Sequence, residues 1–207
     1  YQRALQLTGE DPIPFATVVY LGLARIYFEW NDLDTAEKYG ELSFQLGLLN
    51  DQIIDRAILS QLFMSGIRLT RGDLVGAASF LAQAEQNTRQ KDFAVRLPSI
   101  ATQQVMIYLS QGNIDAAAQI AQQYDLPLLQ ARTLLAQGAL PAALAVLESY
   151  RRQMEEKGWK NNLLLTMVLQ ALALHLQGEN ASARQVLAEA LTLAEPGGFI
   201  RLFVDYG

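Results

Sequence analysis

The chain has 207 residues, of which 51% are hydrophobic and only 18% are charged. This composition allows an extensive buried core and excludes the disordered class of protein. The formal net charge of −5 argues against a nucleic-acid-binding domain, which normally carries a basic surface. Because the chain has no cysteine and a single histidine, disulfides, thiolate metal sites and histidine clusters are excluded as well.

No stretch approaches the roughly 20 apolar residues that span a bilayer, and no secretory signal opens the chain. We therefore expect a cytoplasmic protein without membrane contact. The first residue is Tyr1 rather than Met, and residues 1–8 read as the end of a helix that belongs to a preceding repeat. We expect the chain to be a fragment of a longer protein.

Ten further segments read as helices and fall into five consecutive pairs. Prolines stand at several of the expected helix beginnings, where a missing N–H costs little. The pairs are 14–30 with 33–47, 51–71 with 73–90, 98–111 with 113–124, 126–137 with 139–157, and 161–177 with 179–194. Residues 195–207 are expected to form an irregular or linking tail. Their short alternation at 199–207 has no partner strand, so they should pack as coil or start another helix.

The five pairs share one turn signature. A Gly or Asn is followed by a mostly polar residue and then an apolar residue, and an Ala stands five positions after the Gly or Asn. The copies are NDLDTA at 31–36, GDLVGA at 72–77, GNIDAA at 112–117, GALPAA at 138–143 and GENASA at 178–183. Their starts are spaced by 41, 40, 26 and 40 residues, and the apolar third position breaks to Asn180 in the last copy.

Each part of this signature has a physical reason. The Gly or Asn suits the left-handed position that ends a helix. The next residue can cap the free amides of the following helix, a role open to Asp32, Asp73 and Asn113. The Ala marks a close approach of two helices, and the residue seven positions before the Gly or Asn is also mostly small. These small residues are Ala36, Ala77, Ala117, Ala143 and Ala183 on the second helices, and Ala24, Ser65, Val105, Ala131 and Ala171 on the first.

The first copy lies in an acidic stretch, EWNDLDTAE, which has two interpretations: a metal or acid–base site, or the polar turn between two helices. Its carboxylates, Glu29, Asp32, Asp34 and Glu37, recur only loosely in the other copies. A catalytic pair has no reason to stand at a structural turn that occurs five times. The stretch also lacks the glycine and the distal glutamate of a calcium loop. The helix-cap interpretation is therefore favoured.

The turn signature resembles the tetratricopeptide repeat (TPR), a helix–turn–helix unit, with the period lengthened from about 34 to about 40 residues. A more specific resemblance is carried by ARIYFEWNDLDTAE near the start and LAEPGGFIRLFVDYG at the end. In their order and spacing, these stretches are similar to the helical-repeat domain of large ATP-dependent LuxR-type, MalT-like transcriptional regulators. The resemblance covers nearly the whole chain.

The repeat and the resemblance together predict an all-α fold. It is a superhelical stack of antiparallel helix pairs, a tetratricopeptide-like α-solenoid of about five pairs of roughly 40 residues. We expect a single helical-repeat domain over residues 1–207.

The resemblance also implies an upstream nucleotide-binding NTPase module and a downstream helix-turn-helix that binds DNA. In such proteins the repeat domain receives a small-molecule effector or a protein partner and couples that event to self-association. This chain has no G-x-x-x-x-G-K-[ST] and no basic recognition helix. No cofactor and no direct contact with nucleic acid are therefore expected in it, and ATP and DNA belong, by resemblance, to parts outside it.

Stacking of the tetratricopeptide type would place the first helices of the pairs along a concave groove. By resemblance, the residues that face this groove include Arg25, Phe28, Glu29, Thr102, Met106, Arg132 and His175. Such a surface could bind an effector or a partner helix, or it could pack against absent domains. The residues do not decide between these occupants.

Two features of the groove helices and their surroundings call for separate interpretation. His175 is flanked at four residues by Ala171 and Glu179, which favours a packed or hydrogen-bonded histidine over a metal ligand. The densest basic run, RRQMEEKGWK, is interrupted by Glu155 and Glu156. This interruption favours a solvated helix end over a phosphate-binding patch.

The sequence thus supports two functions and disfavours a third. The first is a regulatory domain of a LuxR-type transcriptional activator, which binds an effector or partner and mediates self-association. The second is a free-standing tetratricopeptide-like adaptor that binds a peptide or helix. An enzyme is not expected, because the chain lacks a nucleophile–base pair, a metal cluster and a cofactor loop.

Overall fold

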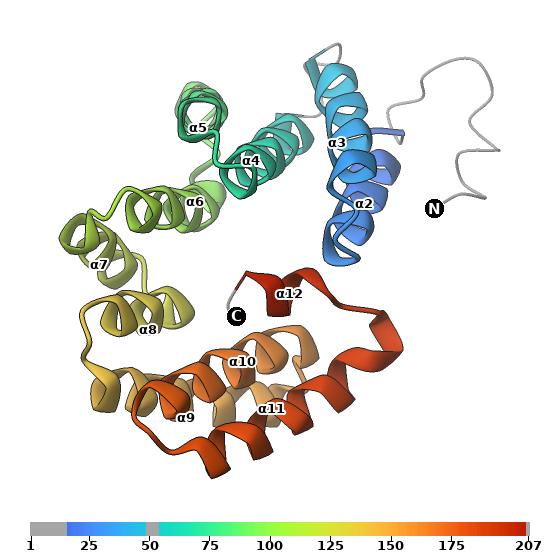
Figure 1. Cartoon of the computed structure of the whole chain (residues 1–207). Helices are drawn as coiled ribbons and strands as arrows, with labels where there is room; N and C mark the ends of the chain where they lie inside the picture. The colour runs from blue at the N-terminus through green and yellow to red at the C-terminus, as the bar shows by residue number, and fades with distance from the viewer. Residues whose placement is uncertain (1–15, 49–53, 206–207) are drawn as a thin grey trace. The chain divides into compact units, whose positions relative to one another are not determined.

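The computed structural model describes residues 16–48 and 54–205, and every regular element in these two stretches is helical. Figure 1 follows the helices along the chain, and a short turn joins the two helices of each pair. Their bounds are α2 Ala16–Glu29, α3 Leu33–Leu48, α4 Ile54–Thr70, α5 Leu74–Gln90, η2 Ala94–Arg96, α6 Leu97–Ser110, α7 Ile114–Gln123, α8 Pro127–Ala136, α9 Leu140–Lys157, α10 Lys160–Leu176, α11 Asn180–Ala194, η3 Glu195–Gly197 and α12 Arg201–Val204.

The ten predicted helices are all present in the described stretches. Every helix end that does not border an undescribed segment lies within one residue of its predicted position. The five pairs are α2/α3, α4/α5, α6/α7, α8/α9 and α10/α11. The helix end predicted at 1–8 lies outside the described residues, as do the first residues of the segments predicted at 14–30 and 51–71.

The turns within the pairs have the backbone geometry that the sequence predicts. The Gly or Asn of every copy is left-handed, with φ between 62° and 89°: Asn31, Gly72, Gly112, Gly138 and Gly178. In every copy, the amide of the next residue donates a 2.9 Å hydrogen bond to the carbonyl four residues before the Gly or Asn. This is the longer hydrogen bond of a Schellman motif. The same few atoms therefore end the first helix and position the start of the second.

Side-chain caps begin three of the second helices, as predicted. Through Oδ1, Asp32, Asp73 and Asn113 each accept a hydrogen bond from the amide three residues on, at 3.1, 2.8 and 3.4 Å. Ala139 and Glu179 hold the same position in the fourth and fifth copies and make no side-chain cap. The left-handed turn is thus the constant part of the signature, and the cap is an addition to it.

The small residues of the signature are buried where two helices meet. The alanines on the second helices have exposed fractions of 0 to 7%: Ala36, Ala77, Ala117, Ala143 and Ala183. Their counterparts on the first helices are buried as well: Ala24, Ser65, Val105, Ala131 and Ala171. The hydroxyl of Ser65 donates a 2.7 Å hydrogen bond to the carbonyl of Ala77, so the α4 side chain reaches the α5 backbone directly.

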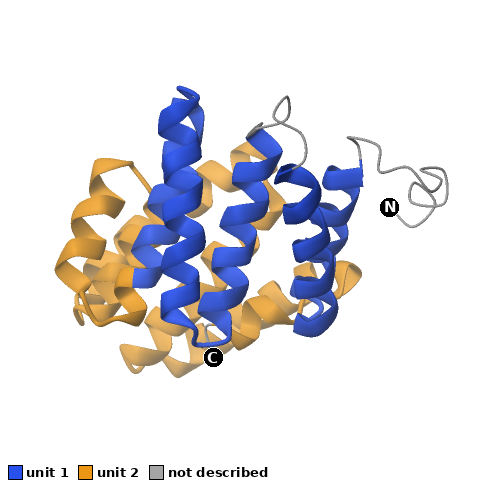
Figure 2. Cartoon of the chain, turned by 90° about the horizontal axis from the view of Figure 1, so that it is seen from above, with its two compact units in different colours: residues 1–107 blue, residues 108–207 orange. Residues whose placement is uncertain are grey.

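The helices divide into two compact units, residues 1–107 and 108–207, which Figure 2 shows in different colours. In the first unit, α3 packs against α4 through Gly40. A Cβ at this position would lie 2.8 Å from Sδ of Met64 and 2.9 Å from the ring of Phe63, so any larger residue would have to displace these side chains. Buried side chains of α4, α5 and α6 form an apolar core that contains Ile58 and Ile100.

The described part of the second unit has two apolar cores. One joins α8, α9 and α10 and includes Leu147 and Leu169. The other joins α10, α11 and α12 and includes Ala190 and Leu202. Through residue 204, the tail is therefore η3 followed by α12, which is the second of the two expected alternatives, coil or the start of another helix. It folds as the start of another helix because Leu202, 7% exposed, has apolar partners on both helices of the last pair.

We predict that Ala77→Leu lowers the free energy of unfolding by about 1–3 kcal/mol, because the added methyl groups overpack the contact between α4 and α5. Ala78→Leu is the matched control, since Ala78 is the next residue of the same helix and is exposed. Its cost should stay within roughly 0.5 kcal/mol. Urea unfolding followed by circular dichroism measures both changes. Equal shifts of the two midpoints would contradict the packing described here.

Candidate functional site

The acids of the first turn are used in a helix cap and in ion pairs. Asp32 caps α3. Asp34 and Glu37 pair with the guanidinium of Arg71, at 2.5 and 2.8 Å. Glu37 also lies 3.1 Å from Arg68, so these acids join α3 to α4. The hydrogen bond that Arg71 donates to Asp34 raises the pKa of the guanidinium. In the described residues, no cluster of three or more His, Cys, Asp or Glu side chains is placed to hold a metal ion.

A pocket of about 280 Å³ opens among three first helices of the first unit. Its lining residues come from α2, α4 and α6: Arg25, Leu59, Leu62, Phe63, Ser99 and Thr102. We call it the α2/α4/α6 pocket. It has an apolar wall from α4, a guanidinium from α2 and two hydroxyls from α6. The lining comes from first helices alone because α2, α4 and α6 hold equivalent positions in successive repeats.

The α2/α4/α6 pocket brings together two of the residues that were predicted to face a groove. Arg25 and Thr102 line it. Phe28 packs edge-on against Phe63, with 6.1 Å between ring centroids, so it supports the pocket wall. Glu29 and Met106 are half-buried and are not part of the lining. That any of these residues contacts an effector or a partner stays a prediction.

A larger hollow of about 820 Å³ lies on the last helix pair. It is lined by Val168, Ala171, Leu172 and His175 of α10, by Asn180, Ala183, Arg184, Leu187 and Leu191 of α11, and by Phe203 of α12. We call it the α10/α11 groove. Most of its surface is apolar, and its polar side chains are close together in the chain, where α10 ends and α11 begins. Its volume lies within the range of small-molecule and cofactor sites.

His175 stands at the polar end of the α10/α11 groove and is hydrogen-bonded, in line with the favoured interpretation. Its Nδ1 lies 2.7 Å from Oδ1 of Asn180. Because an amide oxygen only accepts hydrogen bonds, Nδ1 must carry the proton, and Nε2 is an acceptor when the ring is neutral. Arg184 has no hydrogen-bond or ion-pair partner among the described residues. Arg132, the remaining predicted residue, is half-buried on α8 and lines neither hollow.

The predicted groove residues included none from α11. They were taken from first helices alone, so Arg184, Leu187 and Leu191 on a second helix were missed. One signal in the sequence does point to them. The apolar third position of the turn signature breaks to Asn180 in the last copy only, and Asn180 lies in the groove.

The full length of the chain, residues 1–207, matches the family model described as the MalT-like TPR region. The chain belongs to this family. Its membership confirms the predicted resemblance to the helical-repeat region of MalT-like proteins.

Solved structures confirm the all-α, tetratricopeptide-like fold of this MalT-like TPR region. Two crystal structures from Podosopora anserina, of nearly identical TPR-like repeats in a protein described as a putative kinesin light chain, match it. One of them, a single-substitution form, has 16% identity and a TM-score of 0.55, and the match covers 89% of this chain and 97% of that one. The other has 17% identity and a TM-score of 0.54, with 90% and 99% covered. At such identities the likeness shows the fold alone. No curated protein matches.

Within the described residues of this MalT-like TPR region, no helix is both long enough and apolar enough to cross a membrane.

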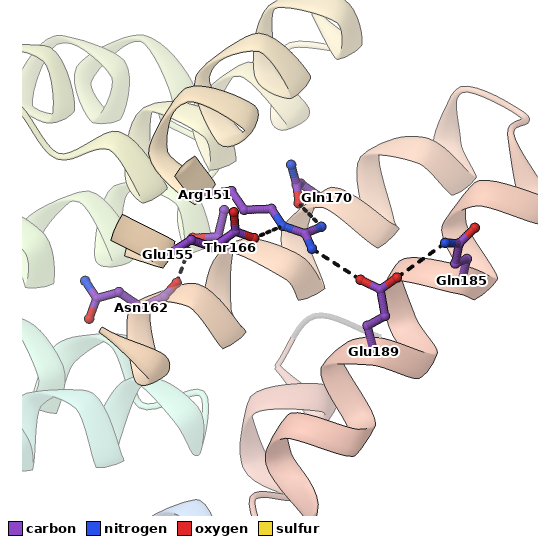
Figure 3. A network of polar contacts seen from close by, with 7 residues as sticks. All are labelled: Arg151, Glu155, Asn162, Thr166, Gln170, Gln185 and Glu189. Carbon is purple, nitrogen blue, oxygen red and sulfur yellow. Dashed lines mark hydrogen bonds and ion pairs between the residues drawn. The ribbon is translucent and has the colours of Figure 1, made fainter. Parts of the chain in front are cut away.

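The basic run RRQMEEKGWK includes a link between three helices, which Figure 3 shows. The guanidinium of Arg151 on α9 donates to Glu155 at 2.8 Å, to Gln170 on α10 at 3.4 Å and to Glu189 on α11 at 3.2 Å. The hydrogen bond to Glu155 raises the pKa of Arg151. The expectation of a solvated helix end is therefore wrong for Arg151, whose side chain is only 26% exposed. Arg152 is 70% exposed and pairs within its own helix.

We predict that Arg151→Ala lowers the free energy of unfolding by about 1–2 kcal/mol, since two half-exposed carboxylates and the Gln170 carbonyl lose their common donor. Arg152→Ala, one residue along the same helix, should cost roughly 0.5 kcal/mol or less, because it removes only an exposed pair. Thermal and urea unfolding of both variants check the difference. If Arg152→Ala cost as much as Arg151→Ala, the contacts across α9, α10 and α11 would not be stabilising.

Proposed function

We propose that this MalT-like TPR region is the regulatory helical-repeat domain of a LuxR-type transcriptional activator. It binds an effector or a protein partner, mediates self-association and carries out no catalysis. The observation that carries this proposal is the match of the whole chain to the MalT-like TPR family. A repeat array suits a regulatory role because its helices present long surfaces that other molecules can contact.

The geometry of the α2/α4/α6 pocket supports a protein partner as its occupant. At about 280 Å³ the pocket is smaller than most sites that enclose a whole small molecule. It can accept one apolar side chain of a partner against Leu59 and Phe63. The guanidinium of Arg25 and the hydroxyl of Thr102 then supply polar contacts at the rim. Buried anchors of this kind provide much of the binding energy at protein interfaces.

In the proposed regulator, an NTPase module precedes the repeat domain and a helix-turn-helix follows it. ATP is bound by the first and DNA by the second, so this domain touches neither. Binding of the effector or partner is transmitted to these modules through the helix pairs. The protein acts in the cytoplasm.

The alternative is a free-standing tetratricopeptide-like adaptor that captures a peptide or a helix. The same α2/α4/α6 pocket favours it, because a pocket formed by three first helices needs no flanking module in order to bind. The two functions differ in what surrounds the repeats in the gene.

The flanking reading frame tests this choice. We predict that the frame encodes a G-x-x-x-x-G-K-[ST] before residue 1 and a helix-turn-helix after residue 207. Sequencing through the natural gene gives the answer. A frame that encodes neither motif would contradict the regulator and favour the adaptor.

A binding experiment tests the pocket itself. We predict that Arg25→Ala combined with Phe28→Ala weakens recovery of a bound partner by at least about tenfold, because the variant removes the cation and a support of the apolar wall. Arg89→Ala is the control, since Arg89 is exposed on α5 and outside the pocket. Quantitative pull-down measures recovery, and circular dichroism checks folding. Unchanged recovery with the double variant would contradict binding at this pocket.

Calorimetric titration of sugars, nucleotides and small signalling molecules forms the second arm of the same test. Heat that appears with the natural domain and is lost in the double variant assigns a small-molecule effector to this pocket. A titration without heat favours control by a protein partner.

A further inference from the structure

The α10/α11 groove leaves large apolar side chains uncovered. Leu187 is 37% exposed and Leu191 is 50% exposed, although both line an 820 Å³ hollow beside Val168 and Phe203. Residues of this kind are normally covered in a helix pair, because burying a leucine side chain stabilises by about 1.5–3 kcal/mol. The groove therefore has the character of a contact surface.

An equivalent surface exists one repeat earlier, where it is occupied. The turn glycines Gly138 and Gly178 are 40 residues apart, so Leu147 of α9 corresponds to Leu187 of α11. Leu147 has no exposed surface, because α10 packs over it with Leu169 and Ala173. In this chain, the groove of one pair is thus covered by the first helix of the next pair. The α10/α11 groove has the same form, and within residues 54–205 no helix covers most of its length.

The short helix α12 shows where such a helix would begin. Leu202 lies 40 residues after Asn162, the residue of α10 that donates a 2.8 Å hydrogen bond to Tyr150 on α9. The counterpart of Tyr150 is Ala190, and Leu202 belongs to the same buried cluster as Ala190. Helix α12 therefore holds the position of the first turns of α10. Its described part has 4 residues and α10 has 17, so among the described residues α12 covers one end of the groove.

We propose that the α10/α11 groove binds an amphipathic helix that follows α12 in the protein, in the way that the α8/α9 pair binds α10. The proposal rests on the proposed function, in which the protein continues past residue 207 toward a helix-turn-helix. The helix continues an established contact, since Leu202 and Phe203 already pack at the start of the groove.

The polar residues of the groove indicate the chemistry of this helix. Relative to the α8/α9 pair, three leucines are replaced by polar residues at one end: Leu135 by His175, Leu140 by Asn180 and Leu144 by Arg184. At the other end the change is reversed, since Leu191 stands where the earlier pair has Arg151. A helix that fits this groove is therefore apolar where α10 has Gln170, and polar where it faces His175, Asn180 and Arg184.

The direction of the bound helix determines which of its ends faces Arg184. Helix α10 runs antiparallel to α9, because Tyr150 contacts Asn162 near the start of α10, while Leu147, about one turn earlier on α9, packs with Leu169 and Ala173 farther along α10. Arg184, which stands near the start of α11, would thus face the last turn of the bound helix. The end of a helix carries free carbonyls and a partial negative charge. Arg184 has no ion-pair partner among the described residues, so its guanidinium is placed to donate hydrogen bonds to the free carbonyls of that last turn.

Thiol labelling tests the proposal, because the chain has no cysteine and a single introduced one reports alone. Leu187→Cys is placed both in the 207-residue chain and in the natural protein that extends beyond it, with any cysteine of the added segments replaced by serine. We expect Leu187→Cys to react at least about tenfold more slowly in the longer protein, as a covered side chain does. Ala188→Cys is the control, since Ala188 is exposed and outside the groove, and it should react equally in both.

A charge variant tests the predicted contact between Arg184 and the last turn of the bound helix. Arg184→Glu in the longer protein should restore most of the labelling of Leu187→Cys, because like charges repel the last turn of the bound helix. Arg152→Glu is the control for charge alone and should leave the slow labelling unchanged. Hydrogen exchange of the α11 amides gives a second measure of coverage if a cysteine variant fails to fold.

Each other outcome overturns the inference. Equal labelling of Leu187→Cys in the two proteins means that no following helix covers the groove. Protection that appears only after a second protein or a metabolite is added assigns the groove to that molecule instead. A natural reading frame that ends at Gly207 removes the proposed helix altogether. Equal labelling in a protein that carries both the NTPase motif and the helix-turn-helix would overturn this inference while leaving the proposed function intact.

Discussion

The left-handed residue at the end of each first helix is the constraint on which the rest of the structure depends. It reverses the chain within a few residues, and its Schellman hydrogen bonds satisfy carbonyls that would otherwise have no partner. The reversal brings the second helix back against the first, and the buried alanine five residues on sets how closely they approach. Every surface discussed above, including both hollows, follows from where these pairs place their side chains.

Much of the fold could be predicted because its signals are local and occur five times. A glycine or asparagine at φ > 0, a capping oxygen and a small residue each act within one turn, so one reading of the pattern places all ten helices. The same turn also ends second helices, where Asp92, Asp125 and Gly158 take the left-handed conformation. Those turns were not recognised, because no alanine stands five residues after any of the three.

The candidate site could be predicted only in part, because it depends on contacts between residues far apart in the chain. The family resemblance implied that Arg25 and Thr102 face a common groove, and both line the α2/α4/α6 pocket. Arg184 could not be placed in this way. It lies on a second helix, and it lines a groove that no helix among the described residues covers at that end. The solvent exposure predicted for Arg151 was wrong for a similar reason. Its partners Gln170 and Glu189 lie on other helices, so no local sequence pattern indicates them.

The contact at Gly40 limits how this protein can vary. A side chain larger than hydrogen would press on Met64 and Phe63 and force them to shift, so the position selects substitutions by size, whatever their polarity. Glycine buries little apolar area itself, so at this point the two helices fit by shape. A different helix could not take the place of α4 simply by being more apolar. Outer positions such as Val75, 83% exposed, are under no such restriction.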